Sequence, residues 1–149
     1  MPKIDLSSLP LTNATGYPPH YADAVAQRWV RRLAPASGLF DFGASQVTLK
    51  PGAWSAQRHW HTDEDELVVM IAGEAVLVDD TGETVMHAGD VAVFPKGDGN
   101  GHCLRNDSTD DCVFVAIGRP SASACHYPDI DLHLPAGGSY TRKDGSAFD

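Results

Sequence analysis

The chain has 149 residues, of which 42% are hydrophobic, and a formal charge of −9 from 20 acidic and 11 basic side chains. This length fits one domain that can bury its own core. The acidic balance argues against nucleic acid and anionic membrane surfaces as partners, because both attract basic proteins. No apolar run approaches the ~20 residues of a membrane span, and residues 1–10 lack the apolar stretch of a signal peptide.

The three cysteines, Cys103, Cys112 and Cys125, cannot all pair within one chain, and the sequence has no C-x-x-C. Free thiols in a reducing compartment are the simplest interpretation. We therefore expect a cytoplasmic protein without structural disulfides.

Residues 1–38 are expected to form an irregular N-terminal arm. Four prolines between residues 2 and 19 interrupt regular structure there. Residues 21–33, YADAVAQRWVRRL, fit one helix or an extended segment, and the sequence does not choose between them.

Residues 39–120 show a β pattern, with short apolar runs separated by glycines, prolines and polar turns. Such runs at regular spacing are typical of a sandwich or barrel, so an all-β domain is predicted. The expected strands lie in QVTLKPG, in ELVVMIAGEAVLVDDTGETVM on both sides of Gly73, in HAGDVAVFPKG, in HCLRNDS and in CVFVAIG.

Residues 121–149 form a C-terminal extension that is too apolar for a solvated tail. We expect it to pack on the barrel or on a partner subunit. Its apolar and aromatic residues are His126, Tyr127, Ile130, Leu132, Leu134, Tyr140 and Phe148.

The stretch from Gly52 to Gly73 carries the strongest chemical signal. Residues two apart on a strand share a face, so His59 and His61 are expected to project together, with Trp60 opposite. After a turn, an antiparallel partner strand can return Glu66 beside the two imidazoles. Two imidazoles and a carboxylate suit a divalent transition metal, and His102 offers a further imidazole.

Plainer interpretations exist for the same residues. A histidine pair on a strand is more often a surface or core feature than a ligand set, and the acidic run 63–66 fits a solvated turn. Glu66 differs from its neighbours because it abuts the apolar run LVVMI, where a carboxylate needs a partner.

Two motifs in this region together resemble the two cupin motifs. The first is Gly52-x6-His59-x-His61-x4-Glu66-x6-Gly73, and the second is Gly89-x5-Pro95-x-Gly97-x4-His102-x3-Asn106. Each has a small insertion relative to the usual pattern, and both insertions fall in loops. The likeness covers residues 50–107, and the chain is also similar to small bacterial cupins, some of which carry sugar-phosphate-isomerase-like labels.

The resemblance implies a double-stranded β-helix, that is, a jelly-roll barrel, with one divalent metal ion near its mouth. His59, His61, Glu66 and His102 would be the ligands, and Zn, Fe, Mn, Ni and Cu all suit them. The implied function is a metalloenzyme acting on a small polar molecule, by isomerase or lyase chemistry or by oxygenation. The alternative is a non-catalytic binding or sensing module, and a homodimer is expected in either case.

Four further residues have plainer expected roles. Arg58 and Cys103 should face away from the metal, with Arg58 structural or at the rim. His87 is expected at the surface, and Asn106 is expected to tie strand backbone. No catalytic or substrate-binding side chain is assigned.

Overall fold

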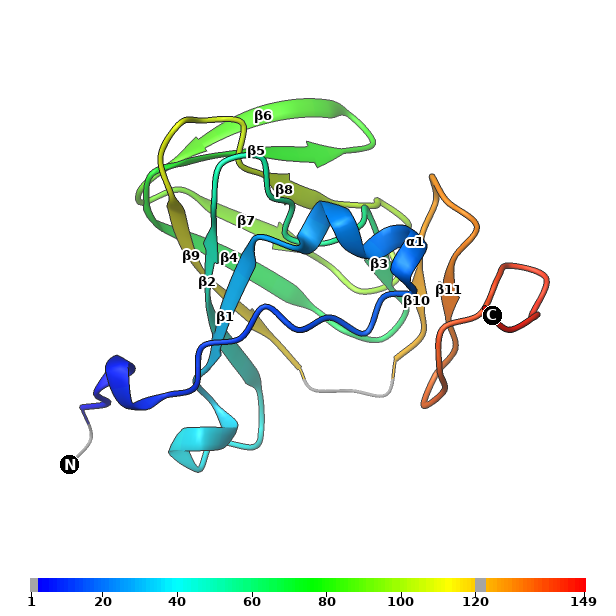
Figure 1. Cartoon of the computed structure of the whole chain (residues 1–149), viewed down its shortest axis with the longest axis horizontal. Helices are drawn as coiled ribbons and strands as arrows, with labels where there is room; N and C mark the ends of the chain where they lie inside the picture. The colour runs from blue at the N-terminus through cyan, green and yellow to red at the C-terminus, as the bar shows by residue number, and fades with distance from the viewer. Residues whose placement is uncertain (1–2, 120–122) are drawn as a thin grey trace.

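The computed structural model describes residues 3–119 and 123–149, and its main architecture is three antiparallel sheets (Figure 1). The large sheet has the order β1-β2-β9-β4-β7, and the two three-stranded sheets have the orders β6-β5-β8 and β11-β10-β3. The strands are β1 Arg28–Arg32, β2 Gly43–Leu49, β3 Trp60–His61, β4 Glu66–Ala72, β5 Glu74–Asp79, β6 Gly82–His87, β7 Val91–Phe94, β8 Cys103–Arg105, β9 Cys112–Gly118, β10 Cys125–His126 and β11 His133–Leu134.

Among residues 3–119 and 123–149, helix is confined to short pieces, so the expectation of an all-β domain is confirmed. The pieces described there are α1, Pro19–Ala22, and 3-10 turns at Leu6–Ser8, Asp23–Val25 and Pro35–Ser37. Within the described ranges, no helix has the length and apolar character needed to cross a bilayer.

The core lies on the inner face of the large sheet, where the period-two pattern buries alternate side chains. On β4, Val68 and Met70 are buried, and in the sheet register they lie level with Ala116 and Phe114 of β9. The core cluster also includes Leu49 of β2 and Leu104 of β8. It therefore joins the large sheet to the sheet that β5, β6 and β8 form.

The arm is less irregular than expected, because it contributes an edge strand to the large sheet. β1 pairs with β2 over five residues, from Arg28 opposite Leu49 to Arg32 opposite Ser45. Thr12 and Val30 exchange two backbone hydrogen bonds, which cover part of the outer edge of β1. Of the two possibilities for residues 21–33, the extended one holds for β1, where backbone pairing outweighs helical propensity.

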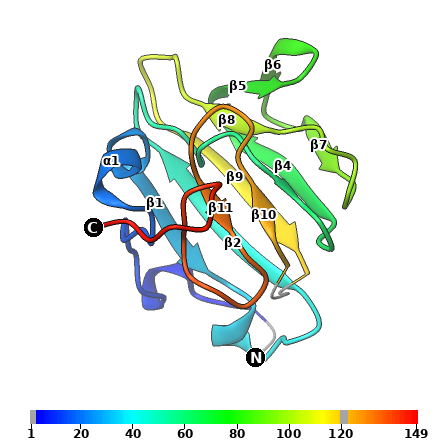
Figure 2. The same cartoon turned by 90° about the vertical axis from the view of Figure 1, so that its right-hand side faces the viewer.

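The C-terminal extension packs on one end of the barrel, together with part of the arm. β10 pairs with β3 on one side and with β11 on the other, and Figures 1 and 2 show this orange-to-red segment at one end of the large sheet. Cys125, Tyr127 and Leu132 form a second core cluster with Tyr17 and Tyr21 of the arm. The expected boundary between residues 120 and 121 lies outside the described residues.

Candidate metal centre

His59 and His102 are held beside each other by their own backbones. His59 N–H donates to His102 O at 3.1 Å, and His102 N–H donates to His59 O at 2.8 Å. This isolated antiparallel bridge brings the two sequence motifs together, and the ring centroids lie 4.8 Å apart. Phe94 stacks on the His102 ring with centroids 3.5 Å apart, which fixes the plane of that imidazole.

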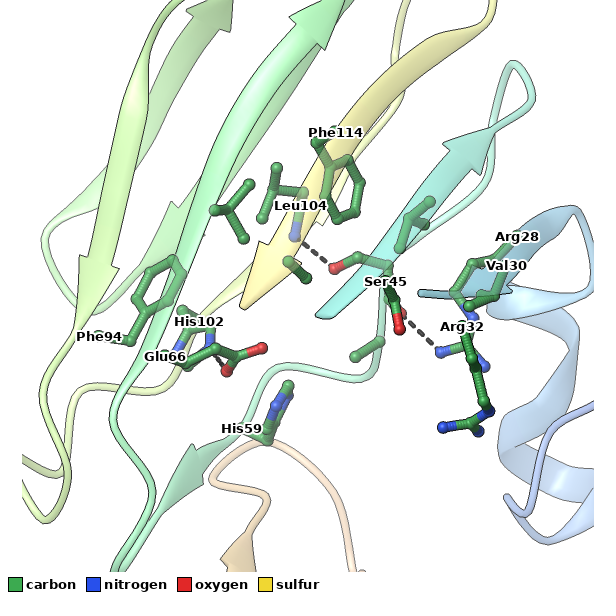
Figure 3. Close-up of a pocket in the computed structure, with 15 residues that line it drawn as sticks. Arg28, Val30, Arg32, Ser45, His59, Glu66, Phe94, His102, Leu104 and Phe114 are labelled. Carbon is green, nitrogen blue, oxygen red and sulfur yellow. Dashed lines mark hydrogen bonds and ion pairs between the residues drawn. The ribbon is translucent and has the colours of Figure 1, made fainter. Parts of the chain in front are cut away.

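Glu66 opens β4 and points toward the same two imidazoles (Figure 3). Its Oε2 lies 3.1 Å from His102 Nε2. The expectation that Glu66 would return on a strand paired with the histidine strand is wrong. Within the described residues β4 pairs with β7 and β9, whereas β3 pairs with β10, so the carboxylate reaches the histidines from a different sheet.

His59, Glu66 and His102 form one group whose ligand atoms all lie within 4.8 Å of one another. His61 lies next to this group, with its Nε2 3.6 Å from Glu66 Oε2 and its ring centroid 4.9 Å from that of His59. Trp60, between the two histidines, stacks instead on His126. His61 also belongs to a second group, with His59 and Cys125.

Burial and the neighbouring imidazoles favour the neutral forms of His59 and His61. Burial, together with the neighbouring His102, lowers the pKa of His59 to about 4, and burial also lowers the pKa of His61. Burial alone would raise the pKa of Glu66, but the His102 hydrogen bond and the surrounding imidazoles lower it overall. Near neutral pH His59 and His61 are therefore unprotonated and Glu66 is ionised, the forms that bind metals.

The donor set fits a divalent transition metal. His59 Nδ1 lies 2.8 Å from Gln57 O, and a carbonyl only accepts, so Nδ1 carries the proton and Nε2 keeps its lone pair. Ligands ~2.0–2.2 Å from one ion lie roughly 3.0–3.5 Å apart at angles of about 90–110°. The separations of 3.1 Å and 3.6 Å from Glu66 Oε2 to His102 and His61 are close to this spacing.

A cavity of about 230 Å³ opens onto the centre. His59, Glu66 and His102 line one side of it, and Arg28 and Arg32 of β1 line the other, as Figure 3 shows. Pockets for drug-sized ligands reach ~300–1,000 Å³, so this one suits a smaller molecule.

Of the four residues with plainer expected roles, Arg58, His87 and Asn106 are placed as anticipated, and Cys103 belongs to neither ligand group. Arg58 has a structural role, since it forms ion pairs with Asp80 and Asp129. The Cys103 thiol is buried, and burial raises its pKa to about 11. The His87 side chain is 66% exposed. Asn106 is fully buried and donates to the carbonyls of Leu49 and Asp110.

Three residues near the centre were not anticipated. Glu64, expected in a solvated turn, is half-buried with its Oε2 3.5 Å from His61 Nδ1, and burial beside Glu66 raises its pKa to about 7. Cys125 lies opposite His61 in the β3–β10 pair. The Tyr127 ring lies 5.8 Å from that of His59. Only the apolar character of the extension hinted at the last two.

Comparison with known proteins places this site in a family. The family model described as "Cupin domain" matches residues 45–118. A crystal structure of a cupin-superfamily sugar phosphate isomerase from Silicibacter pomeroyi is 40% identical, with a TM-score of 0.93, over 99% of this chain and 97% of that one.

Two other solved structures are more distant. A candidate sugar phosphate isomerase from Acidithiobacillus ferrooxidans is 26% identical, with a TM-score of 0.71, over 76% of this chain and 74% of that one. The polyketide cyclase RemF from Streptomyces resistomycificus is 16% identical, with a TM-score of 0.69, over 87% of each chain, and so shares the fold alone. No curated protein matches the chain. With a full-length relative at 40% identity and both motifs in one barrel, the chain belongs to the cupin superfamily.

Proposed function

We propose that this protein is a metal-dependent enzyme that acts on a small polar molecule. The observation that carries the proposal is the group of His59, Glu66 and His102 at the wall of a small cavity. Three protein ligands leave coordination positions open toward that cavity, as in catalytic rather than structural metal sites.

His61 completes the proposed ligand set of His59, His61, Glu66 and His102. Its Nε2 is 3.6 Å from the Glu66 carboxylate, and its pKa is lowered in the same direction as that of His59. Imidazole and carboxylate donors suit Zn, Fe, Mn, Ni or Cu. When bound, such an ion polarises a carbonyl or hydroxyl oxygen of a ligand. The chain itself holds the donors in place through the His59–His102 backbone bridge and the Phe94 stack.

Isomerisation of a sugar, or of a sugar phosphate, is the reaction class we favour. The support is the name of the Silicibacter pomeroyi relative and that of the Acidithiobacillus ferrooxidans protein. Such a reaction moves a proton between neighbouring carbons, and polarising the carbonyl oxygen makes that proton easier to remove. Lyase chemistry on a hydroxy or oxo acid uses the same polarisation, whereas oxygenation would need O₂ at the open position.

Metal analysis tests the centre. Wild-type protein, purified without chelators, should contain about one transition-metal ion per chain by mass spectrometry of the elements. His61→Ala and His102→Ala should each lower the metal content and weaken rebinding. His87→Ala is the matched control, because His87 also lies near a carboxylate, 3.6 Å from Glu74, but is exposed and belongs to neither ligand group. Equal metal content in all four proteins would refute the site.

Proton exchange tests the reaction class. The metal-loaded protein is incubated in D₂O with aldose and ketose phosphates, and the carbon-bound protons next to the carbonyl are followed by NMR. We expect exchange or isomerisation that chelation abolishes and that His61→Ala loses. Binding of these compounds without exchange or conversion would contradict the enzyme proposal and favour the non-catalytic binding module.

We also propose a cytoplasmic homodimer. The three free, buried thiols fit a reducing compartment. Among the described residues β7 pairs only with β4, so its other edge is open, and on its outer face Val91 and Val93 are 58% and 65% exposed. A second copy would cover this edge. Light scattering should give twice the chain mass, and Val93→Lys should shift it toward the monomer, whereas a monomeric wild type would refute the dimer.

A further inference from the structure

The strand β1 turns two arginines into the cavity that holds the metal ligands. Alternate residues of a strand share a face, and Arg28, Val30 and Arg32 all line this cavity (Figure 3). Trp29 and Arg31 are on the opposite face. The cavity therefore has a carboxylate and imidazoles on one side and two guanidinium groups on the other.

Arg28 is poorly satisfied by the protein. Its Nη1 donates to Ser55 O at 2.7 Å, but its Nε is buried without a hydrogen-bond partner. Burial lowers its pKa, which shows that the charged form is partly removed from water. A guanidinium has five N–H donors, and burying it without an anion is costly.

Neither cavity arginine has a carboxylate partner, although the chain has an excess of acids. Within the described part of the chain, Arg28 and Arg32 are in no ion pair, whereas Arg58 and Arg105, which do not line the cavity, each have two carboxylates within salt-bridge distance. Arg31, on the opposite face of β1, also has no ion pair among the described residues, so what distinguishes Arg28 and Arg32 is that both line one cavity opposite the candidate metal ligands.

The space between the arginines and the metal ligands is kept open by small side chains. Arg32 lies level with Ser45 of β2, and Ser45 lies level with Ala116 of β9, which lies level with Val68 of β4. β1 and β4 are three strand spacings apart, roughly 14 Å at ~4.8 Å each. Once side chains fill part of that span from both sides, it accommodates a short carbon chain.

We infer that Arg28 and Arg32 bind the anionic end, a carboxylate or a phosphate, of the small molecule whose polar end faces His59, Glu66 and His102. The inference rests on the proposed function for the orientation of the ligand. Guanidinium groups pair with both oxyanions through two parallel hydrogen bonds. The pair therefore selects anionic substrates over neutral ones of the same size, and it supplies the partner that Arg28 lacks.

Binding to the full-length protein by calorimetry tests the inference. The probes are glycerol 3-phosphate, malate and neutral glycerol, each titrated into protein as purified and again after chelation. We expect at least one anion to bind ten-fold or more tightly than glycerol, with or without metal. Comparing the titration of glycerol 3-phosphate with that of malate shows whether the two arginines bind a phosphate or a carboxylate. Arg28→Gln and Arg32→Gln should each weaken that binding at least ten-fold.

Arg31→Gln is the matched control, with the same charge change on the opposite face of β1. Arg31 also has a buried Nε without a partner. This variant therefore distinguishes the loss of a contact in the cavity from the general effect of replacing an unpaired arginine. It should leave binding unchanged within two-fold. Arg32 is exposed, so its replacement keeps the test valid even if Arg28→Gln does not fold.

Three results would overturn the inference: anions binding no better than glycerol, an equal loss in Arg31→Gln, or loss of binding on chelation, which would put the anion on the metal. Measuring metal content distinguishes failure of this inference from failure of the proposed function. The arginine variants should keep their metal, since neither arginine is a ligand, whereas a protein that binds anions but holds no metal would refute the enzyme proposal alone.

Discussion

Replacing Asn106 with alanine should destabilise the barrel more than any comparable exposed change. Asn106 is fully buried, and its Nδ2 donates to Leu49 O at 2.8 Å and to Asp110 O at 2.7 Å. Its Oδ1 accepts from the backbone N–H and the hydroxyl of Ser108. This one side chain therefore joins the end of β2 to the turn that leads into β9.

The size of the effect follows from these four contacts. A hydrogen bond contributes ~1 kcal/mol net, and a buried group left without its partner costs roughly 1–3 kcal/mol. Water can reach the exposed Asp110 and, in part, the half-buried Ser108, so we expect a loss of about 3 kcal/mol in the free energy of unfolding. For a domain of this size that is a fall of roughly 10 °C in Tm. Urea unfolding followed by circular dichroism measures the free energy of unfolding, and a thermal melt followed by the same signal measures Tm.

Asn13→Ala is the control, because Asn13 is exposed and donates one hydrogen bond, to Ala26 O at 3.0 Å. It should cost ~0.5 kcal/mol or less. Equal losses for the two alanine variants would refute the reasoning.

Asn106→Asp adds a pH signature. The new carboxylate would be buried against two carbonyl oxygens, so its folded pKa would lie above its unfolded value of ~3.9. A raised folded pKa gives stability that is present at low pH and lost as pH rises through it. The deficit of this variant relative to wild type should therefore be smaller at pH 4.5 than at pH 8, and a deficit that grows on acidification would contradict the burial.

Two further predictions concern the backbone and the thiols. Gly73 has a φ of +74°, and an added Cβ would press on the backbone of Asp111 and Cys112, so Gly73→Ala should cost at least ~2 kcal/mol in urea unfolding. Gly82→Ala, also at positive φ but with nothing within 4 Å, should cost less, and equal losses would remove the steric argument. Because Cys103, Cys112 and Cys125 are buried, and burial raises the pKa of Cys112 to about 11, a chromogenic disulfide reagent at pH 8 should label none of them quickly. All three should react in guanidinium, and a fast-reacting thiol in the native protein would contradict the packing.

The strands from residue 43 to residue 118 were predictable because local signals and tertiary structure agree there. Apolar runs end at Gly73, at the Asp80–Gly82 turn and at Pro95, and β4 to β9 fall between these interruptions. β1 was not predictable, because in RWVRR the inward positions of the strand include arginines instead of the apolar residues expected of a core strand. Its inward residues, Arg28 and Arg32, face a cavity rather than packed side chains, so the apolar period is lost.

The candidate centre was also predictable from the sequence only in part. The motif spacing brought His59, Glu66 and His102 together, because both histidines sit on backbone that pairs directly. It did not reveal that Glu66 comes from another sheet, or that Glu64 and Cys125 flank His61. Those contacts depend on how the tail and the 62–65 turn pack, and neither has a periodic pattern that a sequence shows.

The two backbone hydrogen bonds between His59 and His102 have a consequence for how the protein would acquire the proposed ion. The ligands from the two motifs are fixed by the fold itself, so loading involves no folding step and should stabilise the chain only by mass action, ~2.7 kcal/mol at one hundred times the dissociation constant. A ready-made set of imidazoles and a carboxylate follows the general affinity order of divalent metals and does little to reject the wrong one. An ion bound at this proposed centre would therefore reflect the supply in the compartment where the protein folds, and exchange of one ion for another should proceed without unfolding.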